Sequence, residues 1–335
     1  MEAIEDLAVI ITAENGKTLA EARSEVIYAA DFLDWFAGAA PRIDGAVYLN
    51  PTRLNLQSYA DNFPVAVGKV LTQHPEIRKF SFTGSTAVGK LLAAQCSSTI
   101  KRISLELGGN APFIVFDDAD VKKAVEGILA SKFRLSGQTC VCANRAFVQA
   151  GIYNQFAAAV VEKVDEFRLG PGADPKSTLG PLITKQAAEK VEKHVQDALR
   201  RGAETLTGGK PARELGEAFY QPTVLADVSP ESLCAKEETF GPLLPLLKFT
   251  SEEDVLGMVN ASEVGLAGYF FTENVSRAWR AAEALEVGMV GPTGTGLAGY
   301  KLTAHQIGVK QSGIGREGST LGIEEFLEAS QKHNI

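Results

Sequence analysis

Cysteine and histidine are both scarce in this sequence of 335 residues, which contains four of each. Four cysteines are too few to hold a chain of this length together by disulfide bonds. Only Cys140 and Cys142 lie close together, and they lack the second pair of cysteines or the histidines that a structural zinc site needs. We therefore predict neither a disulfide framework nor a metal site. The isolated histidines also give no sign of a Ser-His-Asp triad, although such triads assemble from distant positions.

The sequence also has no excess of positive charge and no long apolar run. Lysine and arginine number 33 against 41 aspartate and glutamate residues, which gives a formal net charge of −8. Binding of nucleic acid or of an anionic membrane needs a basic patch, so we expect neither partner. No run of about eighteen apolar residues occurs, so no membrane span is predicted. The acidic N-terminus is unlike a leader peptide, and we expect a cytoplasmic protein, or a mitochondrial one if a leader has been lost.

Short apolar runs alternate with amphipathic segments along most of the chain. Apolar residues recur at helical spacing after Thr18, a typical helix cap, and proline and glycine then interrupt residues 39–64. The strands predicted from apolar runs cover residues 80–83, 102–107, 112–116, 145–149, 243–249 and 267–271. The helices predicted from amphipathic spacing cover residues 18–40, 87–95, 118–133, 153–167, 184–201, 251–260 and 276–286. This alternation is typical of an α/β fold with a mainly parallel sheet, and the length suggests about two domains.

The first motif, Phe-Thr-Gly-Ser-Thr-Ala-Val-Gly-Lys at residues 82–90, is a predicted strand that runs into a glycine-rich turn and a helix. Gly84 and Gly89 permit close backbone approach, and a helix N-terminus offers N–H groups to a phosphate, so nucleotide binding is the natural interpretation. The spacing from Gly84 to Lys90 also resembles a Walker A loop. That loop needs Ser or Thr at the next position, where this chain has Leu91, which disfavours the alternative. The alternative that this is a glycine turn that binds no ligand remains open.

Three further motifs carry candidate chemistry. In Leu-Glu-Leu-Gly-Gly, an apolar pocket would raise the pKa of Glu106 into the range of a general base. In Gly-Gln-Thr-Cys, Gly137 is expected to leave room for a substrate carbonyl that a thiolate of Cys140 could attack. The fourth motif, Glu-Glu-Thr-Phe-Gly-Pro, contains Glu238 and Phe240. Taken alone, each motif has an ordinary structural explanation, such as a paired acid, an inert buried cysteine or a charged helix end.

The four motifs occur here in the order and spacing of the aldehyde dehydrogenase superfamily, which the chain resembles from about residue 67 to residue 327. Within it, the chain is most similar to the succinate-semialdehyde dehydrogenases, over residues 131–134, 137–142, 265–271 and 308–313. The resemblance implies an aldehyde dehydrogenase-like α/β fold, with a truncated Rossmann-type cofactor domain and an α/β catalytic domain. The implied parts are a partial NAD(P)-binding domain over residues 1–108, a catalytic domain over 109–312 and a C-terminal return and oligomerisation segment over 313–335.

The resemblance also implies residue roles and partners. Cys140 corresponds to the nucleophile that attacks a small-molecule aldehyde, giving a thiohemiacetal that passes hydride to NAD or NADP and a thioester that water hydrolyses to the acid. Glu106 corresponds to the general base. Arg134 corresponds to an arginine that binds the far carboxylate of succinate semialdehyde, with capping of the preceding helix as the alternative. Cys142 resembles a redox-active cysteine, which we expect to form a strained, easily reduced disulfide with Cys140. The residues implied in cofactor binding are Gly84, Ser85, Gly89, Leu107, Glu238 and Phe240.

The chain departs from the family pattern between about residues 40 and 67. The family has a longer stretch there, with a Pro-Trp-Asn-Phe-Pro motif that completes the oxyanion hole and a Lys-Pro-x-Glu motif that binds the adenosine ribose. Only Asn62-Phe63-Pro64 echoes the first motif, and residues 292–306 also replace a more regular family segment. Loss of one oxyanion donor typically lowers the rate by about 10²–10³. Two hypotheses stay open: an NAD(P)-dependent semialdehyde dehydrogenase, forming dimers or tetramers as the family does, and a non-catalytic remnant that acts as a partner subunit.

Overall fold

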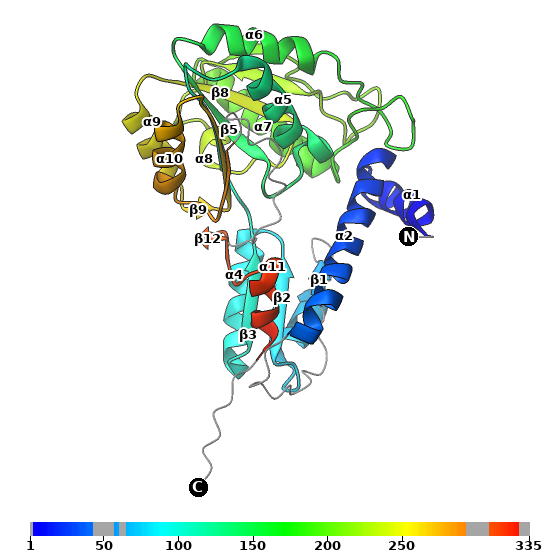
Figure 1. The fold of residues 1–335 in the computed structure, drawn as a ribbon. Coiled ribbons are helices and arrows are strands. Elements are labelled where there is room, and N and C mark those ends of the chain that lie inside the picture. Colours follow the sequence, from blue (N-terminus) through cyan, green and yellow to red (C-terminus); the bar gives the residue numbers. More distant parts are fainter. Residues whose placement is uncertain (1–2, 43–56, 60–64, 293–307, 328–335) are drawn as a thin grey trace.

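The computed structural model describes residues 3–42, 57–59, 65–292 and 308–327 (Figure 1). Strands and helices alternate in these residues, and seven of the ten strand pairs are parallel, which confirms the predicted fold class. Each predicted strand and helix has a counterpart. The divergent segments 62–64 and 293–306 lie outside the described residues.

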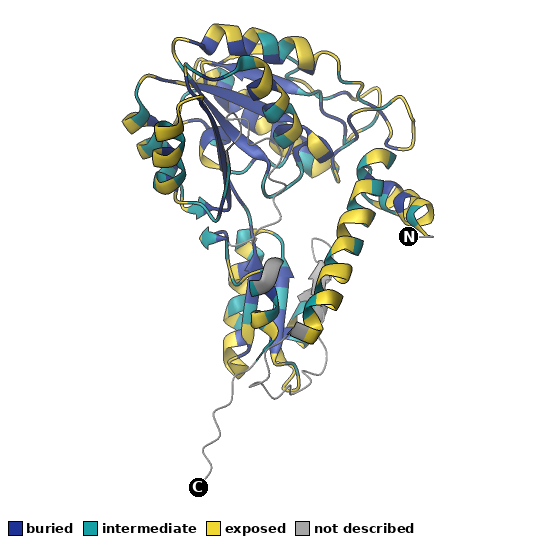
Figure 2. Ribbon diagram, in the orientation of Figure 1, coloured by how far each residue is buried: buried dark blue, intermediate teal, exposed yellow. Residues whose placement is uncertain are grey.

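The larger of two sheets has seven strands in the order β11-β10-β4-β5-β8-β7-β6. All neighbours run parallel except β6, which is antiparallel to β7. The strands are β4 (Ala111–Val115), β5 (Ala143–Gln149), β6 (Glu204–Thr207), β7 (Thr223–Ala226), β8 (Leu243–Phe249), β10 (Ala267–Phe271) and β11 (Met289–Pro292). The sheet forms the buried centre of the upper part of the molecule in Figure 2.

Helices cover both faces of this sheet. The first core contains α5 (Val121–Lys132) and α6 (Tyr153–Val164), and the second contains α7 (Lys185–Arg200), α8 (Leu233–Lys236), α9 (Glu252–Asn260) and α10 (Val275–Ala284). Strand β4 contributes to both cores, with Phe113 and Val115 in the first and Ile114 in the second, where Phe116 follows directly after the strand. A strand that alternates between two cores must be apolar at every position, which explains its continuous hydrophobic sequence.

The smaller sheet has four strands in the order β1-β2-β3-β13. The strands β1 (Gln57–Tyr59), β2 (Lys79–Thr83) and β3 (Arg102–Glu106) are parallel, and β13 (Gly313–Ile314) is antiparallel to β3. Its core is small and includes Phe80, Phe82 and Leu105 from the strands and Leu92 and Cys96 from α4 (Thr86–Cys96). The other elements of this part are α3 (Val65–Gln73), the ribbon of β9 (Val264–Gly265) and β12 (Val309–Lys310), and α11 (Ser319–Gly322).

Two helices precede the sheets, where the sequence predicted one. Thr18 caps α2 (Leu19–Ala39) as expected, and Glu21 completes a reciprocal capping box. The Glu21 carboxylate also accepts from the backbone N–H of Leu135 at 2.7 Å, which fastens the start of α2 to the larger part of the molecule. Helix α1 (Ile4–Asn15) was not predicted, because its apolar residues do not form a single buried stripe: Leu7 and several neighbours are exposed.

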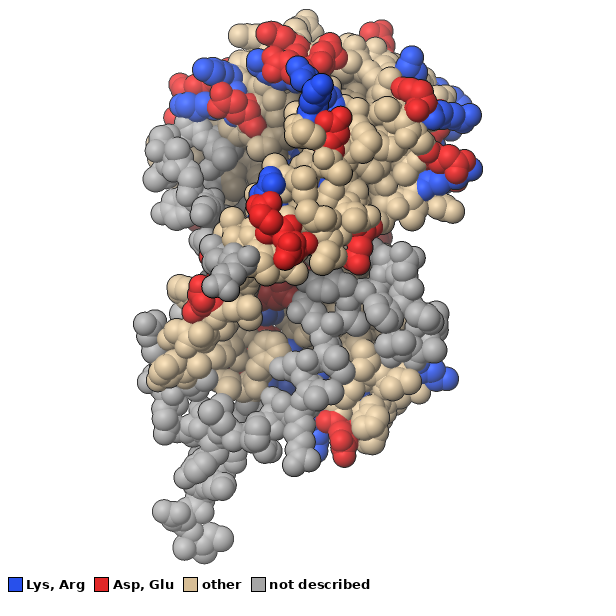
Figure 3. Space-filling view, turned by 90° about the vertical axis from the view of Figure 1, so that its right-hand side faces the viewer, with Lys and Arg blue, Asp and Glu red and all other residues tan. Residues whose placement is uncertain are grey.

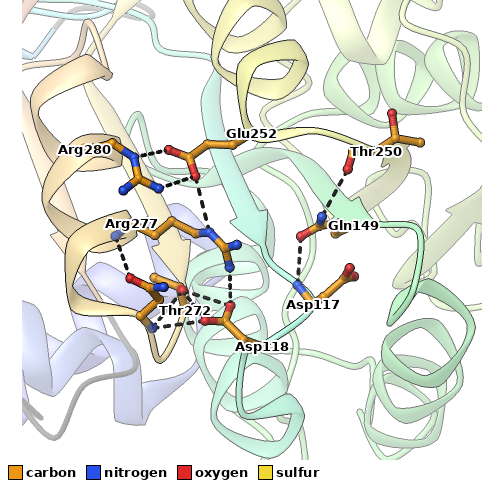
Figure 4. Close-up of polar contacts among 9 residues, drawn as sticks. Asp117, Asp118, Gln149, Thr250, Glu252, Thr272, Arg277 and Arg280 are labelled. Atoms are coloured by element: carbon orange, nitrogen blue, oxygen red, sulfur yellow. Dashed lines mark hydrogen bonds and ion pairs between the residues drawn. The ribbon is translucent and has the colours of Figure 1, made fainter.

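An ion-pair network closes the carboxyl ends of β4, β8 and β10 (Figure 4). Arg277 of α10 lies 2.7 Å from Asp118, which follows β4, and 3.4 Å from Glu252 of α9. Arg280 lies 2.7 Å from the same Glu252 carboxylate. Asp118 also accepts from the hydroxyl of Thr272, directly after β10. The network therefore ties the loops at one end of the sheet to the two helices that cover them.

Charges of both signs are interspersed on the face of the molecule drawn in Figure 3, where no purely basic area stands out from the described residues. Among the helices that the structure describes, none combines the length and the apolar composition needed to span a membrane.

Candidate active site

Two of the sequence motifs meet at the carboxyl end of the smaller sheet. Strands β2 and β3 are parallel neighbours in which Thr83 pairs with Glu106, so both strands end at one edge. The backbone N–H of Gly84 donates to the carbonyl oxygen of Glu106 at 3.0 Å. Because open parallel sheets bind ligands beyond the carboxyl ends of their strands, this edge is the expected place for a nucleotide.

The glycine-rich turn leads into α4, as the sequence predicts. Ser85 caps the helix, with its hydroxyl oxygen accepting from an N–H of the first turn. A Cβ at Gly84 would lie 2.4 Å from the ring of Phe82, and a Cβ at Gly89 would lie 2.4 Å from the side chain of Leu107. Both glycines are therefore required for close packing, and the packing places the N-terminus of α4 at the edge where β2 and β3 end.

The other motifs meet at the amino end of the larger sheet. Gly109, Cys140 and Glu238 precede β4, β5 and β8, which are adjacent parallel strands, so their amino ends share one edge. A Cβ at Gly109 would lie 2.4 Å from the carbonyl oxygen of Cys140. The N–H of Gly109 donates to the Glu238 carboxylate at 3.1 Å. Since Glu106 lies only three residues before Gly109, this turn brings the predicted nucleophile, base and cofactor ligand to the junction of the two sheets.

The loop before Cys140 has a strained backbone. Residues 135–137 all have positive φ, between 53° and 77°, although only the last of them is glycine. A Cβ at Gly137 would lie 2.2 Å from the carbonyl oxygen of Gly241. The prediction that Gly137 leaves room for a substrate is therefore wrong, because the space is filled by the backbone of the Glu-Glu-Thr-Phe-Gly-Pro segment. Left-handed non-glycine residues cluster at functional sites, where surrounding contacts enforce them.

Burial controls the protonation of Cys140 and Glu106. Desolvation raises the pKa of the Glu106 carboxyl to about 8, and the nearby charge of Glu317 adds to the effect. Its Oε2 atom is buried and has no hydrogen-bond partner among the described residues. The pKa of the Cys140 thiol rises to about 12, first through burial and then through the charges of Glu238 and Glu106. At neutral pH the thiol therefore keeps its proton until a base takes it, and Glu106 titrates in the range suited to that task.

A network of buried amides holds the segment around Glu238. The side-chain oxygen of Asn144 accepts from the N–H of Thr239 at 3.0 Å, and its amide nitrogen donates to the carbonyl of Glu237 at 3.0 Å. Burial raises the pKa of Glu238, which the N–H of Gly109 opposes. Phe240 has a φ of 55° and so belongs to the same strained, tightly held region. Asn144 was not predicted as a site residue, and its only signal in the sequence was its position directly before the predicted strand at residues 145–149, which in the structure begins at Ala143.

Arg134 and Cys142 lie on opposite sides of Cys140 in the sequence and differ in exposure. Arg134 is exposed, and no hydrogen bond or ion pair joins its guanidinium to any residue that the structure describes, which leaves the helix-capping alternative without support. Cys142 is buried. Between the two cysteines, the carbonyl of Val141 accepts from the hydroxyl of Tyr269 at 2.8 Å, a contact that fixes the backbone of this loop.

Two residues near the C-terminal end of the described chain complete the surroundings of Glu106 and were not predicted as site residues. The Ser312 hydroxyl donates to the carbonyl of Gly108 at 2.8 Å, and its own carbonyl accepts from Leu107 N–H at 2.8 Å. Glu317 is close enough for its charge to affect Glu106. Ser312 lies in residues 308–313, one of the segments that carry the family resemblance. Nothing in the sequence, however, indicates that Ser312 or Glu317 lies beside the strand that ends at Glu106. In the described part of the chain, no cluster of three or more His, Cys, Asp or Glu could hold a metal ion.

Comparison with known proteins gives consistent matches along the chain. The profile described as "Aldehyde dehydrogenase family" matches residues 1–67 and 64–331. The NADP(+) succinate-semialdehyde dehydrogenase 1 of Schizosaccharomyces pombe is 44% identical, over 98% of this chain and 79% of that protein. A glutarate-semialdehyde dehydrogenase of Pseudomonas aeruginosa is 41% identical, over 97% of this chain and 80% of that protein.

The structural comparison agrees. A crystal structure titled as an NADP-dependent enzyme of Escherichia coli has a TM-score of 0.91 and 42% identity, over 98% of this chain and 81% of that one. The alignment with the S. pombe enzyme extends over 395 positions, which exceeds the 335 residues of this chain by 395 − 335 = 60. At least 60 positions of that alignment therefore have no counterpart here. With the family profile matching most of its length and relatives above 40% identity, this chain belongs to the aldehyde dehydrogenase family.

Proposed function

We propose that this chain oxidises an aldehyde that carries a second, anionic end, with succinate semialdehyde first, to the carboxylic acid in an NADP-dependent reaction. The observation that carries the proposal is the meeting of Cys140, Glu106 and Glu238 at the Gly108-Gly109 turn. The relatives quoted above are named for succinate and glutarate semialdehydes, and the first of them for NADP(+). NAD remains the second cofactor to test.

The candidate cofactor site has features that suit a dinucleotide. Gly84 and Ser85, at the N-terminus of α4, would hold the pyrophosphate through backbone N–H groups. Glu238 and Phe240 would hold the nicotinamide end, and Glu238 is a half-buried carboxylate suited to a ribose hydroxyl. Gly89 and Leu107, which pack against each other next to this turn, would shape the cofactor site. When bound, the cofactor supplies the hydride acceptor.

The residues of this chain would handle the protons and the covalent step. Glu106 takes the proton of the Cys140 thiol and passes it on to solvent, which restores the carboxylate. The sulfur bonds to the aldehyde carbon as a thiohemiacetal anion, which becomes the thioester when hydride leaves its carbon. After oxidation, the same carboxylate takes a proton from the water that cleaves the thioester, which returns the thiol and releases the acid. Arg134 has no intramolecular partner among the described residues and is exposed, so its guanidinium is available to a substrate carboxylate.

The two sheets support a division into the parts that the family resemblance implies. We propose that residues 1–108 form a partial NAD(P)-binding domain, 109–312 the catalytic domain and 313–335 a return segment that serves an oligomer. In support, residues 109–292 contain all seven strands of the larger sheet, and β13 of the return segment pairs with β3. Glu21 and α2 contact the catalytic part, so the first helices belong to the boundary between the two domains.

NADPH formation from succinate semialdehyde tests the proposal. The purified protein and a Cys96→Ala control, which removes a buried thiol at the opposite end of α4 from the candidate cofactor site, should form NADPH. Cys140→Ala should not. No signal above Cys140→Ala would refute the enzyme hypothesis and favour the alternative of a remnant acting as a partner subunit. Arg134→Ala should raise KM for succinate semialdehyde but not for an uncharged aldehyde of similar length.

The disulfide predicted between Cys140 and Cys142 stays a prediction, since all four cysteines are free thiols here. Mild peroxide should cause a loss of activity that a reductant then reverses, and the absence of such a reversible loss would contradict the prediction.

A further inference from the structure

Lys132 is unusual among the buried lysines. Lys17, Lys79 and Lys101 are also buried, and the amino group of each has at least one oxygen partner, a carboxylate, a hydroxyl or a carbonyl. Lys132 is 0% exposed, and the one acceptor for its amino group within the described residues is the sulfur of Cys142, at 3.5 Å. No carboxylate in the described ranges forms an ion pair with it.

Cys142 also contacts the backbone of Lys132, and its thiol lies 3.5 Å from the carbonyl oxygen of Ala143. Its residue is 6% exposed, and its thiol donates to the carbonyl oxygen of Lys132 at 3.4 Å. Burial raises the pKa of the thiol, and the charge of Lys132 opposes that rise. Lys132 is the last residue of α5, and Cys142 directly precedes β5, two elements of one hydrophobic core. The packing of that core therefore holds the amino group and the thiol together.

We propose that Lys132 and Cys142 form an oxidation site, at which peroxide joins the two side chains through a single oxygen atom in an N–O–S bridge. Lys132 first releases its ammonium proton to water. The thiol and the amine then each lose one hydrogen, one oxygen atom enters between sulfur and nitrogen, and two molecules of hydrogen peroxide become three of water. Four electrons pass from the sulfur and nitrogen to the peroxide. Cleavage by an added thiol would return both side chains.

The geometry favours this pair as reaction partners. The nitrogen and the sulfur lie 3.5 Å apart, and they need to move together less to form an N–O–S bridge than to form a direct sulfur–nitrogen bond. The disulfide predicted between Cys142 and Cys140 would use the same sulfur, so the two oxidation products compete for one thiol. Cys140 is partly exposed only two residues away, so a molecule as small as peroxide has a short path to the pair. The inference does not rest on the proposed function, because the bridge forms whether or not the chain turns over an aldehyde.

Peptide mass spectrometry after peroxide treatment tests the proposal. Trypsin should no longer cleave after Lys132, so residues 124–134 should appear linked to residues 135–145, with one oxygen gained and two hydrogens lost. Iodoacetamide added before digestion should still modify Cys140 in the linked species, which places the bridge on Cys142. Dithiothreitol should release both peptides. If the only product is the disulfide within residues 135–145, with cleavage after Lys132 unchanged, the inference is overturned.

Variants and an internal control separate the bridge from non-specific oxidation. Cys142→Ser and Lys132→Arg should abolish the linked species, and Cys140→Ser should retain it. Cys96 and Lys101 provide a matched pair in the same sample: both are buried, but the Lys101 amino group donates to two carbonyl oxygens. A link between these two would refute the geometric argument. The wild-type protein should lose the linked species when it is unfolded in urea before peroxide is added, and equal yield in urea would also overturn the proposal.

Discussion

The burial of the Glu106 carboxyl, whose Oε2 atom has no hydrogen-bond partner among the described residues, predicts that ionisation of this group destabilises the fold above neutral pH. The side chain is 5% exposed, and its pKa rises from an ordinary value of 4.5 to about 8, through burial and then the charge of Glu317. A raised pKa means that the folded state favours the neutral acid. Between these two pH values the unfolded chain loses its proton and the folded chain keeps it, so the unfolded state gains stability. The contribution of the neutral Glu106 carboxyl to the free energy of unfolding is complete below about pH 4.5 and is lost as pH rises to about 8.

The magnitude follows from the two pKa values. At about 1.4 kcal/mol for each factor of ten, the difference corresponds to roughly 5 kcal/mol above pH 8 and about 3 kcal/mol at pH 7. These are upper limits, because structural relaxation and entry of water reduce the penalty for a buried charge. Glu106→Gln keeps the shape and removes the titration, so the variant should become more stable than the wild type as pH rises, while losing activity if Glu106 is the base.

Urea unfolding at about pH 5 and about pH 9 provides the measurement. The free energy of unfolding of the wild type should fall relative to Glu106→Gln by at least about 2 kcal/mol over this interval. Glu166→Gln, at an exposed carboxylate on the surface, should follow the wild type. Parallel pH profiles for wild type and Glu106→Gln would refute the reasoning, because they would mean that Glu106 is solvated or paired in solution.

Other substitutions test how the site is held. Gly109→Ala places a Cβ 2.4 Å from the carbonyl of Cys140 and should lower turnover at least about tenfold and stability by about 1–3 kcal/mol. Gly257→Ala in α9, where a Cβ meets nothing within 4 Å, should stabilise by about 0.5–1 kcal/mol without affecting turnover, and equal effects in both variants would contradict the packing argument. Thr18→Ala removes the capping box and should lower the free energy of unfolding by about 1 kcal/mol, measured in urea; no change would mean that the box adds nothing. Asn144→Ala leaves buried backbone groups without partners and should cost about 2 kcal/mol and raise KM for NADP, whereas an unchanged KM would separate this network from cofactor binding.

Local sequence patterns were sufficient to predict the secondary structure wherever the buried residues recur with the period of a helix or a strand. Strand β8 and strand β10 were predicted with the bounds that the structure has, because both are short, predominantly apolar segments between polar residues. The α2 cap at Thr18 was predicted because a residue type typical of helix caps directly precedes an apolar pattern of helical period, and the structure adds the capping box with Glu21. Helix α1 was missed because its apolar residues, of which Leu7 is exposed, form no single buried stripe, and the two-residue strands are too short to have a periodicity.

The family motifs predicted which chemical groups meet, but not the contacts that bring them together. Gly137 illustrates the difference, because a glycine beside a candidate nucleophile suggested space for a substrate, and a distant carbonyl occupies that space instead. Ser312 and Glu317 lie more than two hundred residues from Glu106 in the sequence, and only the antiparallel return of β13 places them beside it. Such contacts depend on the pairing of remote strands, which no local pattern encodes.

The Arg277 network makes the two ends of the larger sheet different: one end is closed by ion pairs, and the other carries the candidate site. Its ion pairs close the carboxyl ends of the strands, and the candidate site occupies the amino ends. An attachment at the closed end, for example through the loop at Glu273 between β10 and α10, should therefore leave the reaction unaffected. If the protein is tethered to a solid support through that loop, the candidate site stays exposed to the solution. This end of the sheet is therefore suited to immobilisation or to fusion with a second enzyme.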